Sequence, residues 1–167
     1  TAKSKRPGLG AGAAGHVTGG RRLVMTAVLI GVGLNVCLEA QFGPENAAMG
    51  VLDAFMDAFN ARDDEAMCAT FHYPHVRFAG GAVRTYETQS DCVEQFDFNR
   101  FAQRFGWNRS EWDRRTVVHA FPDKVHVLVI FSRFDDAGER ISQFDSLYIV
   151  TRVDDRWGVR ARSSFAP

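Results

Sequence analysis

The chain has 167 residues, of which 46% are hydrophobic and 24% charged, and its formal net charge at pH 7 is zero. This length fits one domain with a single core and a short extension. The balanced charge excludes the strongly basic surface expected of a protein that binds nucleic acid or an anionic membrane surface. Fourteen phenylalanines predict a core, or a cavity, lined by aromatic rings.

The first 44 residues differ from the rest of the chain. Residues 1–22 are basic and rich in Gly and Ala, which is typical of disorder or of a linker. Residues 23–38 form an apolar run shorter than the ~20 residues that a membrane-spanning helix needs. We expect a cytoplasmic protein without a membrane anchor. The alternative is export or anchoring through residues 21–40, which resemble a signal-peptide core.

The three cysteines, Cys37, Cys68 and Cys92, are odd in number, widely spaced and without a CxxC pair. We interpret them as buried free thiols in a reducing compartment, with a disulfide or a catalytic thiol as the alternative.

From residue 45 onward the pattern predicts a folded domain over 45–167. Apolar residues recur at helical spacing from Ala48 to Phe59, which predicts a first helix with Pro44 in its first turn. Asp63 or Asp64 can cap a short second helix that follows it.

A hairpin and a third helix come next. YPHVRF (73–78) and AVRTYE (82–87) read as two strands joined by a Gly-Gly turn. Residues 91–105 read as one helix, in which Asp91 and Glu94 resemble a capping box. Four strands complete the chain, separated by turn residues: 114–121, 124–134, 140–153 and 156–165.

This order, α-α-β-β-α-β-β-β-β, predicts an α+β fold in which a curved antiparallel sheet wraps around three helices. The long strands are apolar on both faces: Val127 and Val129 alternate with Leu128 and Ile130. Since an antiparallel sheet usually has one wet face, we expect a homodimer packed sheet to sheet.

Three motifs, FxxAFNARD, PHVRF and DxxWxVxxRSS, occur in this order over about residues 45–167. Together they resemble the nuclear-transport-factor-2-like (SnoaL-like) superfamily, and more narrowly its uncharacterised bacterial members. The resemblance implies a cone-shaped, often dimeric domain with a cavity between the helices and the concave sheet. The superfamily includes ketosteroid isomerase, other enzymes and non-enzymatic association domains, so the fold leaves the activity open.

The resemblance also tests one mechanism. In ketosteroid isomerase the first helix supplies a tyrosine and the first strand an aspartate base; the matching positions here are Phe55 and about Ala79. Neither side chain can donate or abstract a proton. We therefore do not expect isomerase chemistry of that kind.

His72 and His75 are the only pair of histidines close enough in sequence to suggest a metal site. Pro74 argues against a helix there, and on a strand the odd spacing sends the two rings to opposite faces. We expect no metal and no cofactor.

His75 and Arg77 share one face of the first predicted strand. They could line the cavity and hold an anion or a carbonyl group, or they could satisfy groups at its rim. Asp145 lies mid-strand among apolar neighbours, where it could be a general base or one half of a structural pair with Arg133, Arg160 or Arg162. Tyr148 is a candidate hydroxyl donor.

The candidate catalytic residues are therefore Asp145 and His75, and the candidate ligand-binding residues are Arg77, Tyr148, Trp112, Phe55 and Arg133. The function expected is binding of a small anionic or carbonyl-bearing organic molecule in an aromatic cavity. One alternative is a cofactor-free lyase, isomerase or hydrolase with Asp145 or His75 as the base. The other is a non-enzymatic dimerisation module.

Overall fold

The computed structural model describes residues 43–167. The predictions for the N-terminal extension, including Cys37 and the apolar run, lie outside the described residues. Across the described part, none of the helices combines the length and the apolar character needed to cross a bilayer.

The domain consists of a six-stranded sheet and four helices along the described chain. The sheet has the strand order β2-β1-β6-β5-β4-β3, in which all neighbours are antiparallel except the parallel pair of β1 and β6. In chain order the elements are α2 (Pro44–Ala61), α3 (Asp64–Ala69), β1 (Phe71–Ala79), β2 (Ala82–Tyr86), α4 (Gln89–Gln95), α5 (Phe98–Phe105), β3 (Arg109–Phe121), β4 (Lys124–Phe134), β5 (Arg140–Val153) and β6 (Arg156–Ser164).

The predicted α+β architecture is confirmed, with one correction to its helices. The helix predicted over residues 91–105 is two helices, because Phe96 and Asp97 adopt extended backbone angles between them. The Asp97 side chain then accepts a hydrogen bond from the Arg100 amide at 2.9 Å and caps α5. The capping box of α4 is formed by Thr88 with Asp91, and not by Asp91 with Glu94.

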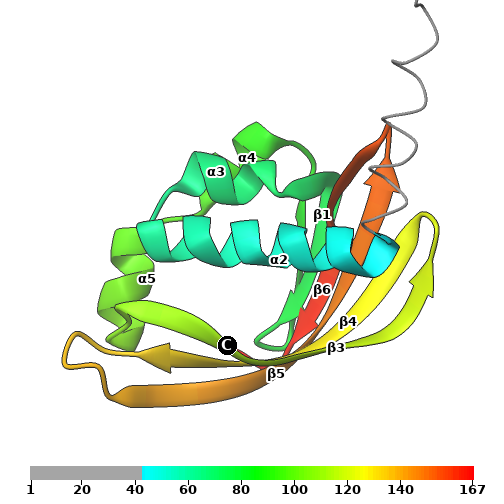
Figure 1. Ribbon diagram of the computed structural model, residues 1–167. Helices are drawn as coiled ribbons and strands as arrows, with labels where there is room; N and C mark the ends of the chain where they lie inside the picture. The colour runs from blue at the N-terminus through cyan, green and yellow to red at the C-terminus, as the bar shows by residue number, and fades with distance from the viewer. Residues whose placement is uncertain (1–42) are drawn as a thin grey trace, which may run out of the picture.

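Figure 1 shows α2 lying across the concave side of the curved sheet, with α3 and α4 on the other side of α2. The apolar stripe of α2 is buried, and Leu52 and Phe55 contribute to a core that continues into the valines of β4. The predicted cap of α3 is confirmed at Asp63, whose carboxylate accepts from the Ala66 amide.

Cys68 in α3 and Cys92 in α4 form a disulfide, and both side chains are fully buried. The prediction of free thiols was therefore wrong, although their burial was expected. The two residues are 24 positions apart in the chain, and the antiparallel hairpin between them brings their helices together. The bond ties the outer helices to each other above α2.

The two faces of the sheet differ in exposure. Val125, Val127 and Val129 of β4 are buried beneath the helices, whereas Leu128 on the opposite face is 49% exposed. Along the outer edge, the pairing of β3 with β4 shifts register twice, between Trp112 and Arg114 and again further along the strand. The apolar outer face keeps sheet-to-sheet dimerisation as a prediction.

Candidate functional site

A cavity of about 640 Å³ lies between α2, α5 and the inner face of the sheet. Its volume is in the range of sites that hold small organic ligands. Most of its apolar wall consists of rings: Phe55, Phe59, Phe96, Phe101, Phe105, Trp112, Phe131 and Tyr148.

The charged lining of this cavity is almost entirely positive. Although the whole chain is neutral, the lining includes a single side-chain carboxylate, that of Asp97, which caps α5. Against it stand six arginines: Arg77, Arg84, Arg100, Arg104, Arg133 and Arg162. Such a concentration of one sign makes the cavity attractive to anions.

Arg77, Arg162 and Tyr148 form a row across three neighbouring strands. Arg77 of β1 is the register partner of Arg162 of β6, and Arg162 is the register partner of Tyr148 of β5. The Arg162 guanidinium donates to the Tyr148 hydroxyl at 3.3 Å and lies 5.3 Å from the ring centroid of Phe55. Arg77 donates to the backbone oxygen of Pro167 at 3.4 Å.

Arg133 enters the cavity from β4 and is only 5% exposed. Its guanidinium carbon lies 4.9 to 5.7 Å from the centroids of four phenylalanine rings, which come from α5, β4 and β5. Burial and the nearby charge of Arg162 lower the pKa of Arg133 to about 10, and the same two causes lower the pKa of Arg77 to about 10. Both guanidinium groups stay charged at neutral pH.

Several of these buried donors have no acceptor among the described residues. The Nε atoms of Arg77, Arg133 and Arg162 and the Nε1 atom of Trp112 are buried without a hydrogen-bond partner. No side-chain carboxylate within residues 43–167 forms a salt bridge with any of the three arginines. The cavity wall thus presents N–H donors for which the described chain supplies no acceptor.

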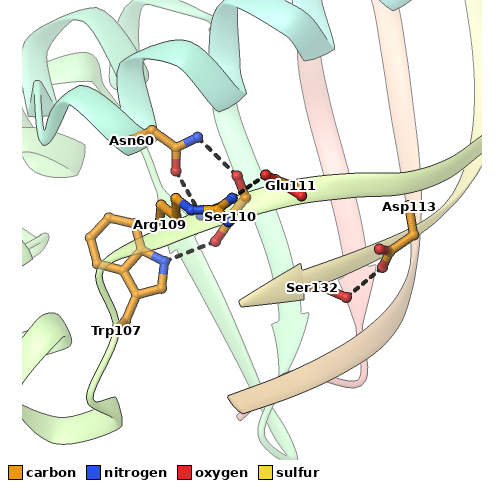
Figure 2. Close-up of polar contacts among 7 residues, drawn as sticks. All are labelled: Asn60, Trp107, Arg109, Ser110, Glu111, Asp113 and Ser132. Carbon is orange, nitrogen blue, oxygen red and sulfur yellow. Dashed lines mark hydrogen bonds and ion pairs between the residues drawn. The ribbon is translucent and has the colours of Figure 1, made fainter. Parts of the chain in front are cut away.

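A polar bracket fixes the strand that carries Trp112. At the end of α2, the Asn60 side chain donates to the Ser110 carbonyl at 2.9 Å and accepts from the Ser110 amide at 2.8 Å. The Trp107 indole donates to the Ser110 hydroxyl at 2.9 Å (Figure 2). This bracket explains the asparagine of the FxxAFNARD motif, because it holds the start of β3 against α2.

Two further contacts involve β3. The Ser132 hydroxyl of β4 donates to the Asp113 carboxylate at 2.7 Å, and Arg109 and Glu111 form an ion pair within β3 (Figure 2). Gln143 donates to the same oxygen of Asp113 at 3.1 Å. The two hydrogen bonds to Asp113 link β3 to β4 and β5. None of these residues belongs to the cavity lining.

The structure brings together all the predicted ligand-binding residues. The cavity lining includes Phe55, Arg77, Trp112, Arg133 and Tyr148. Phe55 and Ala79, the two positions at which the resemblance expects isomerase residues, also face this cavity.

His75, one of the two candidate bases, is not part of the lining. It is fully buried and stacks on Phe71 with ring centroids 4.0 Å apart. Its Nδ1 atom lies 3.0 Å from the Val159 carbonyl, which can only accept, so Nδ1 carries the proton. Burial, followed by the charge of Arg162, lowers the pKa of His75 to about 3, and the ring is therefore a neutral core residue.

Asp145, the other candidate base, does not fit its predicted role. It is exposed, and it is three residues from Tyr148 in a regularly paired strand, so it lies on the opposite face of the sheet from the cavity. Its expected partners are elsewhere: Arg133 and Arg162 line the cavity, while Arg160 donates to the Tyr73 carbonyl at 2.6 Å.

The two neighbouring histidines have separate surroundings. The Nδ1 atom of His72 lies 2.8 Å from the Thr151 hydroxyl, whereas the Nδ1 atom of His75 lies 3.0 Å from the Val159 carbonyl. In the described part of the chain, no three His, Cys, Asp or Glu side chains are grouped so that they could hold a metal ion.

Sequence reasoning missed four lining arginines: Arg84, Arg100, Arg104 and Arg162. Arg162 was considered only as a partner of Asp145. Arg100 and Arg104, four residues apart in α5, share one helix face, and each directly precedes a lining phenylalanine. The repeated Arg-Phe spacing in NRFAQRF was the available signal.

Comparison with known proteins agrees with this fold. Residues 46–164 match a family model described as NTF2-like protein (DUF6841). An NTF2-like protein with a cystatin-like fold from Novosphingobium aromaticivorans superposes with a TM-score of 0.63 at 12% identity, covering 80% of this chain and 87% of that one. A protein of unknown function from Nostoc punctiforme gives a TM-score of 0.61 at 13% identity, with 74% and 90% covered.

A ketosteroid isomerase-like protein from Erwinia carotovora atroseptica gives a TM-score of 0.52 at 17% identity, covering 72% of this chain and 95% of that one. These identities bear on the fold alone. No curated protein matches the chain.

Proposed function

Since the chain belongs to the NTF2-like protein family (DUF6841), whose fold hosts different activities, we propose its function from the cavity: the protein binds a small organic anion with an apolar, ring-bearing body. The observation that carries this proposal is the group formed by Arg77, Arg133 and Arg162, which line the cavity without a carboxylate partner in the described chain. The rings of the lining supply the apolar contacts.

Removing a guanidinium group from water costs several kcal/mol unless an opposite charge and hydrogen bonds offset the loss. A structural arginine is therefore normally buried against a carboxylate or against backbone carbonyls. Arg160 shows that arrangement here, since it is half-buried and donates to the Tyr73 carbonyl at 2.6 Å. Arg133 is surrounded by four phenylalanine rings and its Nε atom has no hydrogen-bond partner in the described chain. An anionic ligand would supply the missing acceptor.

The same lining favours binding over acid–base catalysis. A general base must reach the reacting atom, and neither His75 nor Asp145 is among the lining residues. The one lining carboxylate, Asp97, is already engaged with the α5 backbone. A purely structural dimerisation module is also less well supported, because the phenylalanine side chains surround the cavity and do not fill it.

A thermal-shift screen tests the proposal. The full chain is heated with a panel of aromatic and alicyclic carboxylates and sulfonates, and native mass spectrometry looks for a co-purified ligand. We expect at least one member to raise Tm by several degrees at saturating concentration. Arg133→Met, which keeps the side-chain stem among the four rings but removes the charge, should abolish the shift.

Arg114→Gln is the matched control, because it removes the same charge from an exposed residue outside the cavity lining. It should leave the shift intact. The proposal is wrong if no anion of the panel raises Tm and no ligand co-purifies, or if Arg133→Met and Arg114→Gln respond to the ligand like the parent protein.

A further inference from the structure

We propose that the ligand of this cavity is an organic dianion, whose two negative charges are shared by Arg77, Arg162 and Arg133. The inference rests on the proposed function and specifies the class of ligand. A phosphate ester and a dicarboxylate both satisfy it, since each places two negative charges on a small organic body.

Two like charges are paired directly on the cavity side of the sheet. Arg77 and Arg162 are register partners on adjacent strands, and neighbouring strands lie only about 4.8 Å apart. Like charges in such positions destabilise a sheet. Both side chains line the cavity and lack a carboxylate partner in residues 43–167. An anion between them would turn this repulsion into attraction.

Arg133 belongs to the same electrostatic group as Arg77 and Arg162. The charge of Arg162 lowers the pKa of Arg77 and also the pKa of Arg133. The Tyr148 hydroxyl raises the pKa of both arginines. Arg162 is thus coupled to both of the other cations. The cavity presents three interacting positive charges and not three independent ones.

The number of uncompensated charges favours a dianion. Three of the six lining arginines, Arg84, Arg100 and Arg104, are exposed to water, whereas Arg77, Arg133 and Arg162 are buried or half-buried. A bound monoanion would leave two of these three buried cations uncompensated in the cavity wall, whereas a dianion would leave one. Asp97 does not change this count, because its carboxylate accepts from the backbone of α5. The hydrogen-bond inventory agrees, since four buried N–H donors, including Trp112 Nε1, lack acceptors among the described residues. A phosphate or two carboxylates can accept all of them.

Two matched pairs of probes test the inference in the full-length protein by calorimetry at pH 8. Phenyl phosphate and benzenesulfonate share a ring and a tetrahedral group but carry about two and one negative charges, respectively. Isophthalate and benzoate form the corresponding carboxylate pair. We expect the dianion of at least one pair to bind at least tenfold tighter than its monoanion.

The pair with the larger ratio of dianion to monoanion affinity identifies the source of the two charges. A larger ratio for the phosphate pair means that both charges belong to one group, and a larger ratio for the carboxylate pair means that they are separated. Arg162→Met should reduce that ratio to below threefold, and Arg77→Met provides a second test if the first variant does not fold. Arg114→Gln should leave the ratio unchanged.

Equal affinities within both pairs would overturn the dianion inference while leaving the proposed binding of organic anions in place. An unchanged ratio in folded Arg162→Met and Arg77→Met would overturn it as well. Absence of binding by all four probes would count against both the inference and the proposed function.

Discussion

The disulfide between Cys68 and Cys92 supports a quantitative prediction about the helices above the sheet. The bond closes a loop with a sequence separation of 24 residues between two fully buried side chains. In the chain-entropy description, a loop of this length restricts the unfolded state by about 3.5 kcal/mol at 25 °C. Replacing both cysteines by Ala should lower the free energy of unfolding by about this amount.

For a domain of this size, a loss of about 3.5 kcal/mol corresponds to a decrease in Tm of roughly 10–15 °C. The measurement is thermal unfolding followed by circular dichroism, with Cys37→Ala in both the parent and the double variant so that no other pairing interferes. Because both sulfurs are buried, added reductant should change Tm only after the protein has been unfolded once in its presence.

Two results would refute this reasoning. One is alkylation of both Cys68 and Cys92 in the unfolded, unreduced protein, which would show that the bond is absent. The other is a double variant that melts within about 2 °C of its parent. If the bond is present as purified from the native source, it favours the export alternative for localisation, because disulfides persist in oxidising compartments.

Three further predictions concern stability and assembly. Asn60→Ala removes both hydrogen bonds to Ser110 and should cost about 2–3 kcal/mol in urea denaturation; equal stability of this variant and the parent would contradict the role of these bonds. Because the pKa of His75 is about 3 when folded and 6.5 as its ordinary value, the unfolded chain binds the proton more readily below pH 6.5, and stability falls as the pH drops from 6.5 towards 3. His75→Phe should remove up to about 1.4 kcal/mol per pH unit from that slope, and an unchanged slope would be inconsistent with a neutral buried ring. Leu128→Glu, on the exposed apolar face, should convert the proposed homodimer to a monomer in sedimentation velocity, whereas a parent protein that is already monomeric would rule that dimer out.

The fold was predictable because its signals are local. The apolar spacing of α2, the Asp63 cap and the turn residues between the last four strands each specify an element without reference to the rest of the chain. The break between α4 and α5 was missed because Phe96 and Phe98 continue the apolar pattern across it, so that Asp97 was read as an interior residue and not as a cap. The disulfide was missed because sequence separation carries no information on distance.

For the site, the sequence predicts which side chains share one face of a strand, but not which face of the sheet lines the cavity. Parity placed Arg77 with His75, yet the long arginine side chain reaches the cavity while the imidazole is held between Phe71 and Tyr86. Asp145 was assigned to the wrong surroundings because β5 has apolar residues on both faces. The strand's own sequence therefore does not indicate which face the helices cover.

The edge of the sheet formed by β3 has a consequence for behaviour at high concentration. An exposed edge strand offers unpaired backbone groups on which another chain can add a strand, the step that begins fibrillar aggregation. β3 is 13 residues long, but it carries a dense series of charges from Arg109 to Arg115 and two register shifts that interrupt a flat ladder. Both features oppose strand addition, so the β3 edge should not start fibrils in concentrated solutions.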